Sequence, residues 1–438
     1  NDIQVTNTHL WHIIKYVMEV RLILSYQING GARLQGEYRV RGAKNAALPI
    51  LAASIMTEGE TRIHNCPDIS DVHVMRDIIQ SLGAKTAADN DTVTSDCRGI
   101  CRNEIPQELG ASLRASVFFM APLLSKTGGV AVPEPGGCHI GKRPVDIHID
   151  VMRAFGAGVC ETGEKIICSA DRLCGADITL RFPSVGATEN AVMAAVCAEG
   201  ASRIRNCAKE PEIVCLADYL RSCGAEIKGD GTDAIEINGV KRLHAADIRL
   251  MPDRIECGTY MAMAAATGGE LFAEGINPEY LKSFTEAMEA AGCSFRYFDD
   301  GILLHKNDGL KGDIRIRTEP YPGFPTDLHP QFAAMMCRSG GGCEIEETLF
   351  ENRYKYIEEL KKTGGNIEVF QKKAIIKGVP KLYGSHMKAP DLRGGAALVT
   401  AALCACGESV IDNTQYIQRG YCGFDETIRS LGGDIWTI

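Results

Sequence analysis

The stretch 133–150 combines a thiol, glycines and cations in a spacing that could do chemistry. It reads PEPGGCHIGKRPVDIHID, and it places Cys138 in a glycine-rich turn close to Lys142 and Arg143. Neighbouring cations lower the pKa of a thiol, so Cys138 could act as a nucleophile or as a proton donor. The alternative is a loop cysteine without a chemical role, and the residue types alone leave that alternative open.

The same stretch also has the spacing of a phosphate-binding P-loop, carried by Gly136, Gly141 and Lys142. A P-loop needs Ser or Thr directly after its lysine to hold magnesium, and Arg143 stands there instead. It also opens a helix, whereas the apolar residues after Pro144 alternate and give no clear helix start. We therefore expect a thiol-bearing loop and reject the nucleotide-triphosphate site.

One sequence unit recurs six times, at a period of about 70 residues. Each copy has a glycine, a short strand, an amphipathic helix, and a second glycine that suits a left-handed helix C-cap. The clearest copies are 59–85, 200–226, 268–294 and 341–366, with weaker copies from Gly129 and Gly407. Each copy follows a helix that is rich in alanine or methionine on nearly every face, and such helices are buried.

Six buried helices imply sheets wrapped around them. The chain begins and ends with half a unit, so its two ends should complete one copy together. We predict an α/β protein of two domains with three repeats each, formed by 44–251 and by 1–43 plus 252–438. The two crossings between domains, near 41–44 and 251–253, suggest a hinge with ligand between the halves.

Aligning the copies places six polar residues at or near the first turns of the buried helices. Helix N-termini carry partial positive charge and unpaired N–H groups, so several that face one cleft would attract anions. For the four residues that are not cations, an ordinary N-cap is the simpler interpretation. Lys44 and Arg114 are unfavourable at such positions unless an anion shares the site. The six are Lys44, Arg114, Ser184, Asp253, Asp327 and Asp391.

The composition excludes several classes of function. The 438 residues carry a net charge of -9 without a long basic run, which argues against nucleic-acid binding. Apart from Cys138, the 18 cysteines stand singly in apolar stretches, which predicts buried thiols, a reducing cytoplasm and no metal site. Charged residues interrupt the apolar run 9–25, so we expect no membrane span.

Ten motifs carry a resemblance to a known family. They are GAKNAALPILAA, LRAS, PGGCHIGKRPVDIHI, FPSVGATENAVMAA, AKEPEI, MPDRIECGTY, FPTDLHPQF, FENRY, DLRGGAALV and QRGY. In order and spacing they resemble the bacterial UDP-N-acetylglucosamine 1-carboxyvinyltransferases over about residues 28–437. The resemblance implies the two-domain inside-out α/β barrel of enolpyruvate transferases, without metal or cofactor.

The implied reaction transfers enolpyruvate from phosphoenolpyruvate to the 3-hydroxyl of UDP-N-acetylglucosamine and releases phosphate, which commits material to peptidoglycan. By resemblance, Lys44, Arg114, Arg143 and Arg419 bind phosphoenolpyruvate. Cys138 is the acid, which can also form a covalent adduct, and Asp327 accepts the proton of the sugar hydroxyl. Arg353, Asp391 and Arg393 are expected to line the cleft or to act in its closure, or to form structural salt bridges. Positions that match nucleotide-sugar contacts are Asn45, Arg143, Pro144, Val145, Asp146, Ile147, Ser184, Val185, Gly186, Asp327 and Leu349.

One segment departs from the family pattern. Where the family has HIDRGYE, residues 416–422 read YIQRGYC, so that Arg419 remains while Tyr416, Gln418 and Cys422 replace a histidine and two acids. This departure keeps open a catalytically weak paralogue that binds UDP-sugar and regulates. A shikimate enzyme, 5-enolpyruvylshikimate-3-phosphate synthase, is the other alternative, although it lacks the cysteine loop and the RPVD stretch. Nothing in the sequence predicts an oligomeric state.

Overall fold

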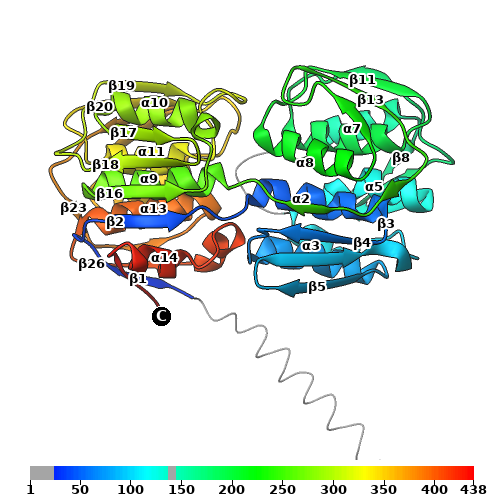
Figure 1. The fold of residues 1–438 in the computed structure, drawn as a ribbon. Helices are drawn as coiled ribbons and strands as arrows, with labels where there is room; N and C mark the ends of the chain where they lie inside the picture. The colour runs from blue at the N-terminus through cyan, green and yellow to red at the C-terminus, as the bar shows by residue number, and fades with distance from the viewer. Residues whose placement is uncertain (1–23, 137–144) are drawn as a thin grey trace, which may run out of the picture.

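Two lobes lie side by side in the computed structural model, which describes residues 24–136 and 145–438 (Figure 1). The first lobe has a core of buried side chains between Ala43 and Leu250. The second lobe has a separate core, formed by residues 26–40 together with 255–435. The chain passes between the lobes twice, and the two passages touch where Gly42 and Pro252 form a β-bridge.

Six inner helices occupy the middle of the lobes, and their residues are buried on all sides. Every residue from Ala187 to Val196 is buried, for example, because small side chains let neighbouring helices pack closely. In the first lobe the inner helices are α2 (Lys44–Ala53), α5 (Met120–Thr127) with the preceding η3 (Arg114–Phe119), and α7 (Val185–Cys197). In the second lobe they are α9 (Arg254–Thr267), α11 (His329–Met336) and α13 (Leu392–Cys404). The prediction of six buried helices is confirmed.

Six further, outer helices are less completely buried. They are α3 (Ser70–Ser81), α6 (Asp146–Ala154), α8 (Pro211–Ser222), α10 (Lys282–Ala290), α12 (Tyr356–Lys361) and α14 (Phe424–Ser430). Five of them bury mainly one face, and α8 buries eight of its twelve residues. Each of the six is followed by a glycine with positive φ, as the repeat predicts for a left-handed C-cap. These glycines are Gly83, Gly156, Gly224, Gly292, Gly364 and Gly432. The shorter elements are α4 (Gln107–Ser112), η1 (Ser54–Met56), η2 (Cys97–Gly99), η4 (Pro278–Leu281) and η5 (Thr414–Arg419).

Helix α6 corrects one expectation, because it begins at Asp146, where the sequence analysis found no helix start. Its nine residues alternate apolar and polar side chains at first, which imitates a strand. The side chains that it buries are nevertheless His148, Ile149, Val151 and Met152. The rejection of a P-loop therefore rests on Arg143 in place of Ser or Thr, and no longer on the missing helix.

Sheets cover the outside of both lobes, so helices lie inside and strands outside. In the first lobe the strand orders are β15-β4-β6-β5, β7-β9-β8, β10-β11-β13-β12 and β14-β3. Their bounds are β3 (Thr57–Glu58), β4 (Glu60–His64), β5 (Lys85–Asp89), β6 (Thr92–Asp96), β7 (Gly129–Pro133), β8 (Gly158–Glu161), β9 (Lys165–Ser169), β10 (Asp177–Thr179), β11 (Ala201–Arg205), β12 (Glu226–Lys228), β13 (Ala234–Asn238), β14 (Leu243–His244) and β15 (Asp247–Arg249).

The second lobe repeats this plan with the orders β17-β18-β16-β2, β19-β20-β22-β21, β24-β26-β1-β27 and β23-β25. The strands are β1 (Tyr26–Asn29), β2 (Gln35–Arg39), β16 (Glu270–Glu274), β17 (Ser294–Phe298), β18 (Gly301–His305), β19 (Ile314–Arg317), β20 (Gly342–Glu346), β21 (Asn366–Phe370), β22 (Lys373–Lys377), β23 (Leu382–Tyr383), β24 (His386–Lys388), β25 (Ala405–Cys406), β26 (Glu408–Asp412) and β27 (Asp434–Thr437). Strand β1 lies between β26 and β27, with Tyr26 opposite both Ile411 and Thr437. The two ends of the chain thus complete one unit, as predicted.

The cysteines follow the expectation in part. All 17 cysteines in the described ranges are free, and ten of them are buried. Four are exposed, however, which corrects the prediction that the scattered thiols are core residues: Cys101, Cys160, Cys174 and Cys406. Within the same ranges no helix has the length and apolar character needed to cross a membrane.

Candidate functional site

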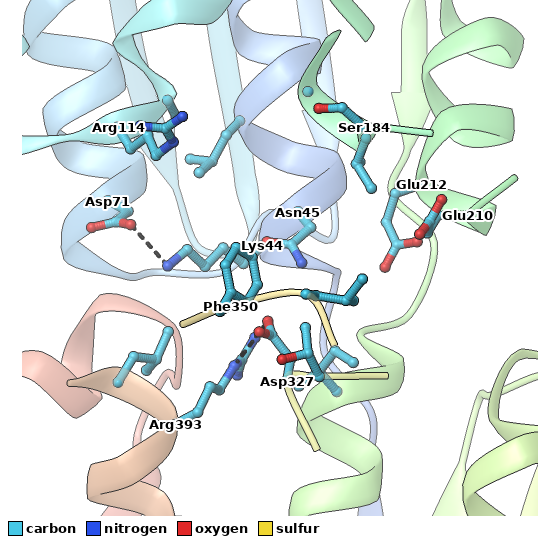
Figure 2. A pocket seen from close by; sticks show the side chains of 18 of the residues that line it. Lys44, Asn45, Asp71, Arg114, Ser184, Glu210, Glu212, Asp327, Phe350 and Arg393 are labelled. Carbon is cyan, nitrogen blue, oxygen red and sulfur yellow. Dashed lines mark hydrogen bonds and ion pairs between the residues drawn. The ribbon is translucent and has the colours of Figure 1, made fainter. Parts of the chain in front are cut away.

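A cavity of about 1130 Å³ separates the two lobes. Its walls come from both of them: Lys44 and Arg114 belong to the first lobe, and Asp327 and Arg393 belong to the second (Figure 2). The beginnings of α2, α3, η3, α6, α7, α9 and α13 all reach the cavity wall. Several helix N-termini therefore meet at one cleft, which favours anionic ligands although the whole chain is acidic.

The helix ends also settle which polar residues are caps. Asp253 accepts hydrogen bonds from the amides of Ile255 and Glu256 in α9, and also from the amide of Lys44 at 3.1 Å. One carboxylate thus caps α9 and satisfies the first amide of α2. Ser184 caps α7 through the amide of Ala187, and Asp391 caps α13. The N-cap interpretation is correct for these three residues and wrong for Asp327, which lies two residues before α11.

One end of the cleft is a cation cluster bridged by a buried acid. Asp71, on α3, forms one ion pair with Lys44 Nζ at 2.8 Å and another with Arg419 Nε at 2.8 Å. Arg419 lies on η5 of the second lobe, so Asp71 ties the two lobes together at this end. Burial alone would raise the pKa of Asp71, but Lys44 and Arg419 outweigh burial and lower it. Burial lowers the pKa of Lys44, which Asp71 partly offsets.

Asp327 faces this cluster from the second lobe, held between two guanidinium groups. Arg353 donates to its Oδ1 at 2.7 Å, and Arg393 donates to its Oδ2 at 3.2 Å. Both arginine side chains are only 3% exposed, whereas the Asp327 side chain is 30% exposed. The two arginines therefore orient the carboxylate from behind and leave it accessible from the cleft.

The opposite end of the cleft is acidic. Glu212, on α8, pairs with Arg254 Nε at 3.0 Å, and Glu210 accepts a hydrogen bond from the Tyr321 amide at 3.4 Å. Both contacts join the first lobe to the second. Burial first, and then the charges of Glu212 and Glu210, raise the pKa of Glu189 well above its usual value. The cleft thus runs from a cationic end to an end with neutral or paired carboxyl groups.

Comparisons with known proteins agree with this geometry. A family described as EPSP synthase (3-phosphoshikimate 1-carboxyvinyltransferase) matches residues 28–428. A UDP-N-acetylglucosamine 1-carboxyvinyltransferase of Caldanaerobacter subterraneus is 43% identical over 94% of this chain and 99% of its own. One from Wolbachia pipientis is 42% identical over 92% and 96% of the two chains. The chain belongs to the UDP-N-acetylglucosamine 1-carboxyvinyltransferase family.

Solved structures place the fold in the same group. The enolpyruvyl transferase NikO of Streptomyces tendae superposes with a TM-score of 0.86 at 25% identity, over 95% of this chain and 99% of NikO. An EPSP synthase of Acinetobacter baumannii shares the fold, with a TM-score of 0.71 at 18% identity over 95% and 100% of the chains. The enolpyruvate transferase fold of two lobes with three repeats each is confirmed.

Most of the residues that the family motifs single out line the cleft. They are Lys44, Asn45, Arg114, Asp146, Ile147, Ser184, Val185, Gly186, Asp327, Leu349, Arg353, Asp391, Arg393 and Arg419. Val145 does not line it, because its side chain packs into the core of the first lobe. Cys138, Arg143 and Pro144 lie outside the described residues. Among the residues that are described, no group of three or more His, Cys, Asp or Glu side chains could hold a metal ion.

Asp146 has a partner that the motifs did not indicate. Arg181, which lines the cleft before α7, forms ion pairs with Asp146 and with Asp150 on α6. The sequence analysis also missed Asp71, Glu189, Glu210, Glu212 and Arg254. Four of these stand inside matched motifs, yet their role depends on partners in the other lobe or repeat, which spacing along the chain does not reveal.

Proposed function

We propose that this protein transfers enolpyruvate from phosphoenolpyruvate to the 3-hydroxyl of UDP-N-acetylglucosamine and releases phosphate, the first committed step toward peptidoglycan. The observation that carries the proposal is the arrangement across the cleft. An oriented carboxylate, Asp327, lies across the cleft from Lys44 and Arg114. Arg419 also lines the cleft and is joined to Lys44 through Asp71, so cations from three separate repeats serve one site. This arrangement suits an acceptor hydroxyl on one side and a small dianion on the other.

Phosphoenolpyruvate carries a phosphate and a carboxylate, so its site needs several fixed cations. Arg114 and Arg419 can each grip an oxyanion with two N–H groups, and Lys44 adds a compact charge. Arg143 joins this set by resemblance. Fixed cations and helix ends that exist before the substrate arrives stabilise developing charge without reorganisation.

The reaction requires two proton movements in its addition step. Asp327 takes the proton of the sugar 3-hydroxyl while that oxygen bonds to C2 of phosphoenolpyruvate, and Cys138 donates a proton to C3. The C2–O bond to phosphate then breaks as C3 loses a proton, which leaves the enol ether and inorganic phosphate. The role of Cys138 is supported by the resemblance, and the role of Asp327 is supported also by its partly exposed, oriented carboxylate.

The acceptor would span the cleft. We assign its contacts to residues of both lobes, because a ligand held by both lobes favours the closed state. The proposal includes two domains, 44–251 and 1–43 plus 252–438, and a cytoplasmic setting, which the free thiols of the described ranges support. The assigned contacts are Asn45, Arg143, Pro144, Asp146, Ile147, Ser184, Val185, Gly186, Asp327 and Leu349, and Val145 is left out because its side chain packs into the core of the first lobe.

Phosphate release tests the proposal directly. The purified chain is incubated with phosphoenolpyruvate and UDP-N-acetylglucosamine, with shikimate 3-phosphate as the control acceptor. We expect phosphate with the nucleotide sugar only, its loss in Cys138→Ala, and little change in Cys197→Ser on α7. Release with shikimate 3-phosphate would establish the shikimate enzyme. No release from folded protein that binds UDP-N-acetylglucosamine would establish the regulatory paralogue.

A further inference from the structure

Glu347 is a buried carboxylate directly behind the wall of the cleft. It follows strand β20 in the second lobe and is 1% exposed. Its Oε1 accepts three hydrogen bonds, from Thr318 Oγ1 at 2.9 Å, from the Leu349 amide at 2.8 Å and from the Phe350 amide at 3.1 Å. One oxygen therefore ties the turn after β20 to the end of β19.

The second oxygen of Glu347 reaches a different segment. Its Oε2 accepts hydrogen bonds from Thr326 Oγ1 at 2.7 Å and from His329 Nδ1 at 2.9 Å. A carboxylate can accept about four hydrogen bonds, so five donors occupy its capacity fully. These donors also explain why the carboxylate tolerates burial without a cation, since hydrogen bonds to the charged form stabilise it.

The two segments held by Glu347, at Thr326 and at Leu349–Phe350, both belong to the wall of the cleft. Thr326 directly precedes Asp327, and Arg353 also bonds to the Thr326 carbonyl at 3.3 Å. Leu349 and Phe350 line the same cavity as Asp327. A single side chain that does not line the cavity thus holds the two pieces of backbone that would contact the acceptor sugar.

The hydrogen bond between His329 and Glu347 depends on which imidazole nitrogen carries the proton. Because an ionised carboxylate only accepts hydrogen bonds, His329 must carry its proton on Nδ1. Its Nε2 is buried without a partner. Burial lowers the pKa of His329, and hydrogen bonds from His329, Thr326 and Leu349 outweigh burial to lower the pKa of Glu347 to about 2.

We propose that Glu347 is a positioning residue that locks the Thr326–Asp327 segment and the Leu349–Phe350 turn into one half-site for the nucleotide-sugar acceptor. It sets acceptor affinity and leaves the affinity for the small dianion unchanged, because the cations for that ligand stand on α2, η3 and η5. The inference deepens the proposed function and depends on it for the identity of the acceptor. A merely structural residue would instead weaken both ligands together.

The first test replaces Glu347 with glutamine. The amide group meets Thr326 and the Nδ1–H of His329 with a donor instead of an acceptor. The bond to His329 then survives only if the imidazole moves its proton to the buried Nε2, and the other hydrogen bonds lose their charged acceptor. We expect the Kd of UDP-N-acetylglucosamine, measured by calorimetry, to rise about 10-fold, and the KM of phosphoenolpyruvate to stay within about 2-fold. Glu344→Gln is the matched control, since Glu344 lies three residues earlier and pairs with Lys373 on the outer surface.

A second variant separates positioning from damage. His329→Asn can place an amide oxygen near the position of His329 Nδ1, where it accepts the hydrogen bond that the glutamine amide offers. We expect Glu347→Gln/His329→Asn to recover most of the acceptor affinity that Glu347→Gln loses. Equal weakening of both substrates, unchanged acceptor affinity in Glu347→Gln, or no recovery in the double variant would overturn the proposal.

Hydrogen exchange decides the same point without any ligand. In Glu347→Gln the amides of 324–328 and 347–350 should exchange faster together, while those of α2 stay as in the wild type. Unchanged exchange in either segment would also overturn the proposal. Absence of UDP-N-acetylglucosamine binding by the wild type would sink the proposed function alone, because the exchange result still reports on Glu347.

Discussion

At the scale of residues, Asp327 is the proposed general base, and two arginines fix the orientation of its carboxylate. Two nearly inaccessible guanidinium groups hold its oxygens, and its remaining surface faces the cleft. We predict that Asp327→Asn lowers kcat for phosphate release by about 10²- to 10⁴-fold, the usual contribution of a general base. The asparagine keeps the shape of the side chain but cannot take the hydroxyl proton.

Phosphate release and calorimetry check this prediction together. Binding of UDP-N-acetylglucosamine should weaken much less than turnover. The matched control is Asp177→Asn, which removes a carboxylate from an exposed pair with Arg205 and should change neither quantity, since neither residue lines the cleft. A kcat within 2-fold of the wild type in Asp327→Asn would remove the base from the mechanism.

Asp71 offers a second prediction with a defined sign. Its negative charge raises the pKa of Lys44 against the lowering effect of burial. In Asp71→Asn that support is lost, so Lys44 should lose its proton at lower pH, and the alkaline limb of kcat/KM for phosphoenolpyruvate should shift to lower pH. In the double variant Asp71→Asn/Lys44→Arg the shifted alkaline limb should disappear, because arginine keeps its charge over the whole pH range of the measurement. A limb that stays in place in Asp71→Asn would contradict the role of Lys44.

At the scale of elements, the sequence predicts the helices whose residue pattern is local. The inner helices were recognisable because alanine and methionine cover all their faces, and the outer helices because each ends at a glycine. Helix α6 was missed because its first residues alternate like a strand. The pairing of Asp71 with Arg419 spans 348 positions, and Glu347 collects donors from four places. Such contacts arise only when repeats pack, so no local pattern could predict them.

Helix α9 carries a prediction about stability and pH. Glu256 in its first turn is 2% exposed and pairs with Arg41 at 3.4 Å. Burial raises its pKa to about 8, against the lowering effect of Arg41. Between the ordinary value and about 8 the folded state keeps a proton that the unfolded state has released. This group therefore makes folding less stable as pH rises through that interval, and its effect levels off above about 8.

Melting temperatures across pH 5 to 9 measure this effect as a difference. Glu256→Gln cannot ionise, so its melting temperature relative to the wild type should rise as the pH increases. Glu286→Gln on the exposed face of α10 is the control and should give a flat difference. A flat or falling difference for Glu256→Gln would mean that the glutamate is ionised in the folded state at neutral pH.

At the scale of the molecule, contacts at both ends of the cleft join two separate cores. Asp71–Arg419 joins them at the cationic end, and Glu212–Arg254 joins them at the acidic end. Each lobe has its own cluster of buried apolar side chains, and the other crossings described above, Lys44–Asp253 and Glu210–Tyr321, are polar. Separate cores with polar connections predict that the lobes unfold as two units whose stabilities respond to different substitutions.

Matched core substitutions test this. Ile435 on β27 and Ile227 on β12 occupy equivalent edge strands of the two lobes, and they are 0% and 5% exposed. Each change to alanine should lower the free energy of unfolding of its own lobe by about 2–5 kcal/mol. Calorimetry should resolve two transitions, with Ile435→Ala lowering one and Ile227→Ala lowering the other. Ile435 lies beside β1, so its effect also reports whether the ends of the chain stabilise the second lobe. If both variants lower a single shared transition equally, the polar contacts across the cleft are strong enough to make the two lobes one cooperative unit.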